Sequence, residues 1–408
     1  MILTFAWRNI WRNKTRSLVV VTALALGIWA ALAMTGMATG MMRSYVRSAI
    51  GIQTAHLQIH HPVFREQMES RYLLPEPDQL QTTLLSMDGV SGVALRSIAQ
   101  GMVASSRGTR GVLIKGVDPG HELTVSTIGS KVISGAFEEL ENSNGILISV
   151  QLAEKLKVGL RKKVVLTVQD LSSTITSGAF RVVGLFHSGN TPFDEAHVFV
   201  HRRDLNRILA AGQSGSIPGH EIAVLLDRPE RAFPMADSLR QIWPTLDVNT
   251  YRQLSPDLQL YESQIGSISL IYLSVIMLAL VFGIINTMLM AVLERTREIG
   301  MLMAIGMNRV LIFRMIVLET LMLSVIGAPF GLLLGAITLG WIGKKGIDLS
   351  SFSESLAEFG LDAMLYLEVD PQVWFQVPAA VLLTGVVAAL YPAWKAVRLK
   401  PVESMKRL

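Results

Sequence analysis

Four long stretches of this chain are almost free of charge: Ser17–Met42, Ser263–Leu293, Met315–Gly343 and Pro371–Trp394. Only Glu319 interrupts the third stretch. A bilayer core about 30 Å thick needs roughly 20 apolar residues of α-helix, so each stretch is long enough to cross it. The pattern predicts one transmembrane helix, an inserted domain of about 220 residues, and then three further transmembrane helices.

The inserted domain, residues 43–262, mixes two periodicities. Alternation of apolar and polar residues predicts strands at His56–His60, Gly111–Val117, Val164–Val168, Phe180–Phe186 and Ala196–Val200. Helical spacing predicts helices at Asp78–Met87, Val150–Leu156, Arg203–Ala211 and Glu230–Trp243. The fold class is therefore a four-helix membrane protein with a large α+β extracytoplasmic domain, of one or two lobes, between helices 1 and 2.

Basic residues cluster beside the apolar stretches on one side only. They precede the first stretch, lie between the second and third, and follow the fourth: Arg8, Arg12, Lys14, Arg16; Arg295, Arg297, Arg309, Arg314; Lys395, Arg398, Lys400, Lys406, Arg407. The loop 344–370 is acidic instead. By the positive-inside rule, both termini and the loop 294–314 are cytoplasmic, and the large domain and the acidic loop lie outside.

These patterns divide the chain into nine segments. We expect a cytoplasmic interfacial amphipathic helix (1–16), TM1 (17–42), the α+β domain (43–262), TM2 with a stalk (263–293), a cytoplasmic coupling-helix loop (294–314), TM3 (315–343), a short acidic external loop (344–370), TM4 (371–394) and a cytoplasmic tail (395–408).

Composition narrows the possible functions. Charged residues make up 17% of the chain and hydrophobic residues 50%, as expected when much of a chain lies in a membrane. The net charge of +5 follows from the membrane topology, so we expect no nucleic-acid partner. The chain has no cysteine, which excludes disulfides, Cys-type zinc sites and a lipidated cysteine. No small-residue cleavage site ends the first stretch, which we interpret as a retained anchor.

No enzyme motif stands out, and we expect no catalytic, cofactor-binding or metal site. The segment Gly340–Gly346 lacks the spacing and the Ser or Thr of a phosphate-binding loop. The pairs His56/His60 and His197/His201 each share a strand face, but no third ligand converges on them. We interpret these histidines as solvated.

The loop between the second and third stretches has a different character. A dense charged turn, starting at Glu294, leads into a short apolar segment bounded by Gly300 and Gly306. A small helix with a charged rim and one apolar face fits a groove on a cytosolic partner; an ordinary polar connector is the alternative. The candidate coupling residues are Glu294, Arg295, Arg297, Glu298, Ile299, Gly300, Met303, Ala304 and Gly306.

Glu319 is the one carboxylate inside an apolar stretch. A charge there is costly unless it is paired or reaches water. We expect it to face the bundle and pair with Arg314 or Arg295, in a coupling or dimer contact, or alternatively to snorkel to the interface.

Several motifs resemble one family of membrane proteins. They are Ala6–Asn13, the run Glu294–Gly306 with Glu319 downstream, and the ending Tyr391–Met405, joined in the inserted domain by Gly145–Gly159 and Phe180–Gly189. Together they resemble the FtsX-like permeases of ABC transporters, the group that contains MacB and the lipoprotein-releasing LolC/LolE subunits.

The resemblance implies a dimeric permease, with a second copy or a paralogue, in the bacterial inner membrane. It implies two copies of a separate cytosolic ATPase that bind ATP and Mg, no cofactor on this chain, and Glu294–Met307 as the helix that docks on the ATPase. ATP-driven motion would be relayed to the external domain, and substrate would be extracted from the outer leaflet.

An acyl-chain cleft fits that reading, because the spans offer no polar pathway across the bilayer. Candidate lining residues are Met34, Met37, Met41, Ile268, Ile271, Tyr272 and Val275. Methionine adapts to irregular apolar shapes, although ordinary helix packing explains the same residues.

The size of the domain and the separate-subunit plan favour the LolC/LolE side of the group, as does an extended exit segment at Gly51–His60. We therefore expect release of lipoproteins or other lipidated substrates, with lipids and a periplasmic lipoprotein, chaperone or adaptor as further partners. A transducer to a periplasmic hydrolase and an efflux permease working with an adaptor are the alternatives.

Overall fold

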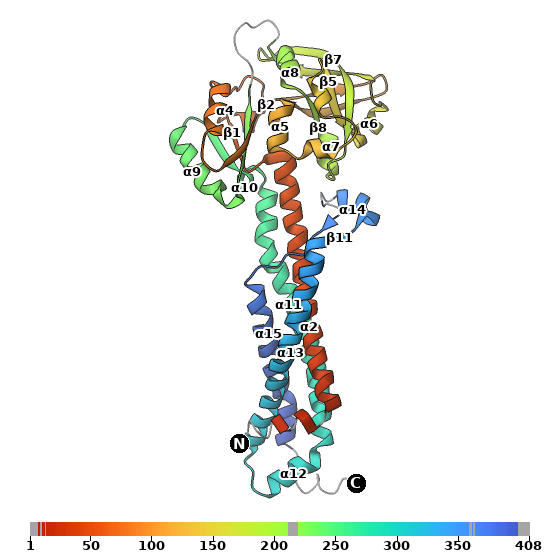
Figure 1. Cartoon of the computed structure of the whole chain (residues 1–408), viewed down its shortest axis with the longest axis vertical. Helices are drawn as coiled ribbons and strands as arrows, with labels where there is room; N and C mark the ends of the chain where they lie inside the picture. Colours follow the sequence, from red (N-terminus) through yellow and green to blue (C-terminus); the bar gives the residue numbers. More distant parts are fainter. Residues whose placement is uncertain are drawn as a thin grey trace. The chain divides into compact units, whose positions relative to one another are not determined.

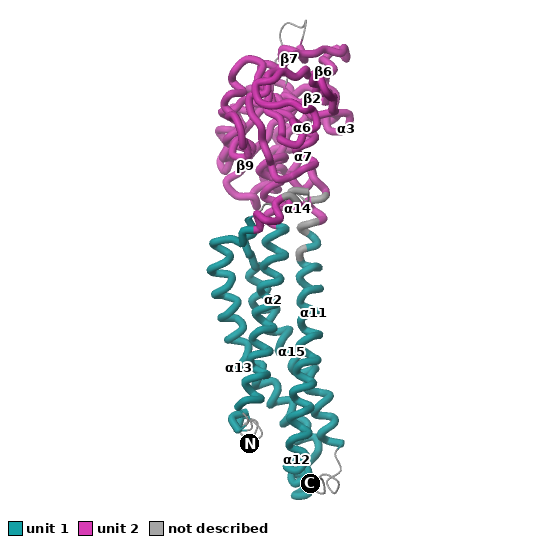
Figure 2. The backbone as a smooth tube through the Cα atoms, turned by 90° about the vertical axis from the view of Figure 1, so that its right-hand side faces the viewer, with its two compact units in different colours: residues 1–42, 263–348, 364–408 teal, residues 43–262, 349–363 magenta. Residues whose placement is uncertain are grey.

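The computed structural model describes residues 7–8, 10–12, 14–210, 219–358, 361 and 364–398. The chain folds into two compact units (Figure 2). Unit 1 comprises Met1–Met42, Ser263–Asp348 and Met364–Leu408, and unit 2 comprises Arg43–Glu262 and Leu349–Ala363.

Long helices running side by side make up unit 1 (Figure 1). They are α2 (Lys14–Ala49), α11 (Pro256–Glu294), α13 (Arg309–Lys345) and α15 (Val373–Val397), with the short α12 (Thr296–Ala304) between α11 and α13. Among the described residues, four segments are long and apolar enough to cross a bilayer: Lys14–Thr54, Gly266–Glu294, Arg309–Lys345 and Val373–Val397. Each contains or largely overlaps one of the predicted charge-free stretches.

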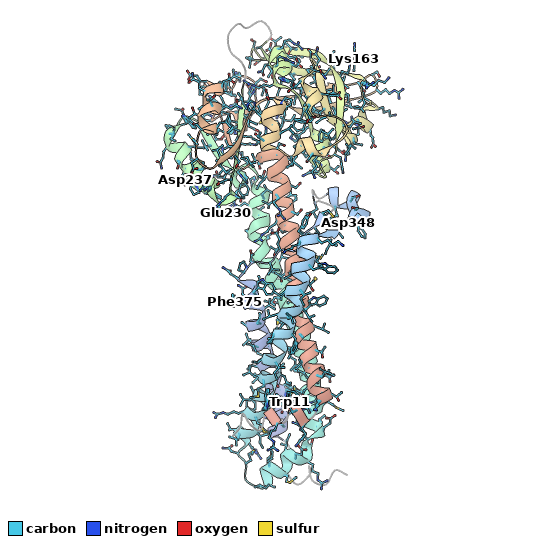
Figure 3. All side chains as sticks on the ribbon, in the orientation of Figure 1. Trp11, Lys163, Glu230, Asp237, Asp348 and Phe375 are labelled. Carbon is cyan, nitrogen blue, oxygen red and sulfur yellow. The ribbon has the colours of Figure 1, made fainter. Side chains whose placement is uncertain are left out.

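The outer faces of these helices are apolar. Phe375 on α15 is 80% exposed, and Phe282 and Val275 on α11 are 65% and 62% exposed (Phe375 is labelled in Figure 3). Such continuous apolar exposure is unfavourable in water and is expected where lipid is the solvent.

The interfacial helix predicted for residues 1–16 lies partly outside the described residues. Residues 7–8 and 10–12 are helical, and α2 already begins at Lys14. Trp7 and Trp11 are exposed, whereas Ile10 is buried, which is the amphipathic arrangement expected of an interfacial segment (Trp11 is labelled in Figure 3).

A row of glycines brings α2 and α13 into close contact. A Cβ atom added to these glycines would clash with side chains of α2: Gly327 with Leu24 at 3.0 Å, Gly331 with Ile28 at 2.6 Å, and Gly335 with Leu32 at 2.5 Å. Each pair has the same sequence separation, 303 residues, so the two helices run parallel in a constant register. Small residues at every fourth position allow backbones to approach closely in a membrane.

The predicted loop 344–370 contains regular structure. Strand β11 (Ile347–Asp348) pairs with β12 (Met364–Leu365), and η5 (Ser350–Phe352) and α14 (Ser353–Glu358) lie between them in sequence. After β12, the backbone N–H of Glu368 donates to the carbonyl of Gly36 at 3.1 Å. Gly36 and Gly40 leave room on α2 for this segment.

Unit 2 is an α+β domain with a mixed sheet. Its strands are β1 (Leu57–His60), β2 (Val90–Ala104), β3 (Thr109–Val117), β4 (Val132–Gly135), β5 (Gly145–Ser149), β6 (Lys163–Gln169), β7 (Ile175–Phe186), β8 (His197–His201), β9 (Glu221–Leu226) and β10 (Asp247–Thr250). Its helices are η1 (Ile50–Thr54), α3 (Phe64–Gln67), α4 (Pro77–Leu85), α5 (Pro119–Val125), η2 (Ile128–Lys131), η3 (Glu138–Glu141), α6 (Val150–Leu156), α7 (Thr191–Ala196), α8 (Arg202–Leu209), η4 (Pro229–Arg231), α9 (Ala232–Ile242) and α10 (Tyr251–Leu254).

Strand β2 is shared by two lobes. Its first half pairs with β9 in the order β10-β1-β9-β2, and its second half pairs with β3. Strand β6 pairs with both β2 and β7, so β2, β3, β8, β5, β7 and β6 close into a ring. Each lobe has its own apolar core: α4 and α9 cover the first sheet, and the ring surrounds the second core.

The five strands and four helices predicted in this domain are confirmed to within a few residues. Strands β2, β4, β5, β9 and β10 were not predicted. In β5 and β9 nearly every residue is buried, so their sequences are continuous apolar runs without alternation. The extended segment predicted at Gly51–His60 is wrong in its first half, which is the π-helical turn η1.

The glycine row gives a stability prediction. A Cβ on Gly331 would meet the Cβ of Ile28 at 2.6 Å and the carbonyl oxygen of Ala25 at 2.7 Å, and neither can rotate away. We expect Gly331→Ala to destabilise the folded chain by about 1–3 kcal/mol, measured as thermal unfolding in detergent.

Gly340→Ala on the same helix is the matched control, because nothing lies within 4 Å of the added Cβ. Both changes gain helix propensity, so the difference between them isolates packing. Equal melting temperatures for the two variants would contradict the close contact of α2 and α13.

Candidate functional site

Helix α12 forms one end of unit 1, next to the start of α2 and α13 (Figure 1). It ends where Gly306 adopts a φ of +98°, a left-handed conformation that glycine takes without strain. The side-chain oxygen of Asn308 then accepts a hydrogen bond of 3.0 Å from the N–H of Val310 and caps α13. This turn makes α12 a separate short helix.

Most of the predicted coupling residues lie on two faces of α12, while Glu294 ends α11, Arg295 is the N-cap of α12 and Gly306 follows it. Ile299 is 4% exposed, and Arg295 and Gly300 are also buried, so these three face the bundle. Met303 is half-buried, and the others are exposed: Glu294, Arg297, Glu298, Ala304 and Gly306.

Two exposed apolar residues at this end were not predicted. Met301 and Ile305 are 50% and 79% exposed, and their spacing of four places them one turn apart. That spacing was visible in the sequence. Together with Arg297 and Glu298 they give α12 an outer surface with an apolar centre and a charged rim.

Glu319 is buried and bonded to two arginines. Its Oε1 accepts from Nη2 of Arg16 at 3.0 Å and from Nη1 of Arg295 at 3.3 Å. The prediction that Arg295 pairs with Glu319 is confirmed; the ion pairs found for Glu319 among the described residues do not include Arg314. Arg16 was missed, because nothing local in the sequence places it beside α13.

These contacts tie three elements together. Arg16 belongs to α2, Arg295 is the N-cap of α12, and Glu319 belongs to α13. A second, exposed ion pair joins Arg12 to Glu298 on α12. A cavity of about 350 Å³ lies among these groups, lined by Arg12, Arg295, Glu298 and Glu319 together with apolar residues of α11 and α12. Helix α12 is thus fixed to α2 and α13 by charge.

The predicted acyl-chain residues are mostly exposed on the helix surfaces. Met34, Met37, Ile271 and Val275 are 41–62% exposed, whereas Met41, Ile268 and Tyr272 are half-buried. A cavity of about 220 Å³ between α2, α11 and α15 is lined by Thr35, Leu270 and Leu273, among others. None of the seven predicted residues lines it.

The interpretation of the histidines as solvated is wrong for His56 and His60, which are 7% and 3% exposed. Strand β1 lies between β10 and β9 and is buried on both faces, so its alternating sequence does not correspond to a solvent-exposed face. Nδ1 of His56 accepts from the N–H of Leu226, and Nε2 of His60 lies 3.2 Å from Glu221. Within the described residues, no group of three metal ligands occurs.

Glu221 belongs to a buried ion cluster in unit 2. Arg96 is 1% exposed and donates to Glu122 through Nε at 2.9 Å and Nη2 at 2.6 Å, while Nη1 donates to Glu221. Burial would raise the pKa of Glu221, but Arg96 outweighs it and holds that pKa well below its ordinary value. The cluster bridges β2, α5 and β9, and so holds the junction of the two lobes.

Two family descriptions match the sequence. Residues 17–242 match the MacB-like periplasmic core domain, and residues 270–401 match the FtsX-like permease C-terminal region.

Among relatives, the "Lipoprotein-releasing system transmembrane protein LolC" of Xylella fastidiosa is 22% identical over 96% of this chain and 93% of its own length. The "Pyoverdine export ATP-binding/permease protein PvdT" of Pseudomonas syringae is 25% identical over 98% of this chain. The chain spans 58% of the length of that protein.

Two solved structures are similar at low scores. The periplasmic region of MacB from Actinobacillus actinomycetemcomitans has a TM-score of 0.35 at 11% identity and covers 52% of this chain and 95% of its own. The extracellular domain of YknZ from Gram-positive bacteria has a TM-score of 0.33 at 15% identity, with 48% and 99% covered.

Removing the charge of Glu319 should destabilise unit 1. In Glu319→Gln, the buried Arg295 and the half-buried Arg16 lose their anion, so we expect a loss of about 3 kcal/mol in thermal unfolding in detergent. Glu294→Gln, an exposed change, is the control. A Glu319→Gln variant as stable as the control would mean that the ion pairs do not form.

The ion cluster of unit 2 should make stability depend on pH. Because the pKa of Glu221 is lower in the folded chain, its contribution is present above the ordinary value of 4.5 and is lost as the pH falls below it. We expect Glu221→Gln to be less stable than the parent by about 3 kcal/mol at neutral pH, and this gap to shrink at acidic pH.

Melting temperatures measured from neutral pH to below 4.5 check this expectation, with exposed Glu138→Gln as control. If the difference in melting temperature between Glu221→Gln and the parent stayed constant with pH, protonation of Glu221 would not contribute to the loss of stability in acid.

Proposed function

Since this chain belongs to the MacB-type family of FtsX-like ABC transporter permeases, we propose that it works as a dimer with a separate cytosolic ATPase that docks on α12. ATP and Mg would be bound by that ATPase, and this chain would carry out no chemistry of its own. The end of the bundle with α12 would face the cytoplasm of the inner membrane, as the distribution of basic residues indicates.

The outer surface of α12 carries this proposal. Met301 and Ile305 form an apolar centre beside Arg297 and Glu298. An amphipathic helix with anchors one turn apart fits an apolar groove on a partner. Since the buried side of α12 packs on the bundle through Ile299, the exposed side is available for docking.

The ion pairs of Glu319 support a mechanical role for α12. When the ATPase moves α12, Arg295 would move with it, and Glu319 and Arg16 would carry the displacement to α13 and α2. Helices α2 and α11 lead along the chain into the inserted domain, so motion of these helices would reach that domain. Transport by such a relay needs no polar pathway through the bundle.

For the substrate, we favour a lipidated or amphipathic molecule taken from the outer leaflet. The similarity to LolC, named for lipoprotein release, covers nearly the full length of both chains. The exposed apolar faces of α2 and α11, with Met34 and Met37, offer lipid-facing surface for acyl chains. An export permease acting with a periplasmic adaptor is the second candidate, favoured by the similarity to PvdT.

Mass spectrometry of the complex, purified gently with its lipids, tests both candidates. An ATPase with acylated lipoproteins would support extraction of lipidated cargo. An ATPase with an adaptor and no acylated cargo would support export, and an ATPase with a hydrolase would favour signal transduction. Purification without any ATPase would contradict the docking proposal.

The same experiment applies to variants of α12. We expect Arg297→Ala and Glu298→Lys each to reduce the co-purified ATPase by about ten-fold, equivalent to about 1.4 kcal/mol of binding, without lowering the melting temperature.

Because Glu298 pairs with Arg12, the double variant Arg12→Glu/Glu298→Lys is the control. It restores the ion pair with reversed charges. Recovery of the ATPase in the double variant would mean that Glu298 acts only by holding Arg12, and would remove it from the docking surface.

A further inference from the structure

Unit 2 contains a cavity of about 220 Å³ that the transport proposal does not use. Its polar wall includes Lys115, His197, His60 and Glu221, and its apolar wall includes Ile98 and Leu113. Ile98 and Lys115 are paired across β2 and β3, so one face of these strands forms part of the wall.

Lys115 is the unusual member of this wall. It is 5% exposed, yet within the described part of the chain no hydrogen bond or ion pair of its ammonium group is found. Its Nζ lies 5.8 Å from the centre of the Phe193 ring. A buried ammonium carries three donors and a full charge, both of which are costly to leave without an acceptor.

The carboxylates nearby are already engaged. Glu122 accepts two hydrogen bonds from Arg96, and Glu221 accepts one from Arg96 and faces His60. Arg96 and Lys115 together balance the charges of these two carboxylates. Arg65 also lines the cavity, but its guanidinium lies 3.8 Å from Asp247 and donates to the backbone carbonyl of Gln253.

The histidine beside Lys115 is neutral. Nδ1 of His197 donates to the carbonyl oxygen of Phe193 at 3.0 Å, since a carbonyl can only accept. Burial, and then the charge of Lys115, lowers the pKa of His197 to about 3. Burial, and then the charge of Arg96, also lowers the pKa of Lys115 to about 8.

We propose that this cavity binds a carboxylate on a short apolar stem, with the ammonium of Lys115 on the carboxylate and Ile98 and Leu113 against the stem. The guanidinium of Arg65 is engaged by Asp247 and by the carbonyl of Gln253, so the cation offered to the ligand is the ammonium of Lys115. A single ammonium suits a carboxylate better than a phosphate, which is usually held by several N–H groups. The carboxylate comes either from a small free acid or from an acidic side chain of a peptide. Binding of either ligand at this cavity does not require the ATPase that the proposed function invokes.

Acetylation of the full-length chain in lipid nanodiscs tests the site. Brief treatment with acetic anhydride, followed by peptide mass spectrometry, gives the modified fraction of Lys115, with exposed Lys163 as internal reference (labelled in Figure 3). The probes are butyrate, its neutral analogue butyramide, and a capped peptide with one glutamate. We expect a carboxylate probe at about ten times its Kd to reduce modification of Lys115 roughly ten-fold, and butyramide to have no effect.

Protection by butyrate identifies a free acid as sufficient, and protection by the glutamate peptide alone identifies a peptide source. Equal protection by butyramide, or no protection by either carboxylate, would overturn the proposal.

Thermal unfolding gives an independent readout. Lys115→Met keeps the shape of the side chain and removes the charge, so this variant should fold. We expect a saturating carboxylate probe to raise the melting temperature of the parent by roughly 2–4 °C and that of Lys115→Met not at all. The same shift in both proteins would place the carboxylate elsewhere and overturn the site.

Discussion

The parallel contact between α2 and α13 determines the rest of unit 1. Without a hydrophobic force between helices in lipid, close backbone approach has to hold them, and the glycines of α13 allow it. The register set by those glycines also places Arg16 opposite Glu319, because this pair has the same separation of 303 residues. The burial of Glu319 is thus possible because two helices meet at one fixed offset.

The second arginine extends this contact to α12. Arg295 occupies the N-cap position of the short helix and shares Glu319 with Arg16, so the position of α12 is linked to that of α2 and α13. The outer surface of α12 carries exposed residues that do not pack against the bundle, such as Ile305. An inner side held by charge and an outer side with an exposed apolar centre is a suitable design for a helix that receives force from a partner.

The sequence was informative where periodicity and charge are local. The spans, the charged turn before α12 and the alternating strands all follow from neighbouring residues. The buried strands β5 and β9 do not alternate, and the burial of His60 depends on strands that flank β1 from distant positions. Arg16 and Lys115 were missed for the same reason: their surroundings are created only by folding. The glycine spacing of α13 is visible in the sequence, but which helix the glycines face depends on the fold.

The regular glycine row has a weakness of its own. If α2 slid along α13 by four residues, about 6 Å, glycines would again face side chains, and the packing would be nearly as good. A periodic interface therefore allows several alignments of the two helices with similar packing. Arg16 and Glu319 do not repeat along the row, and a slip of one turn would separate them and leave the buried carboxylate without this partner. The ion pair thereby selects one helix register from several of similar packing energy.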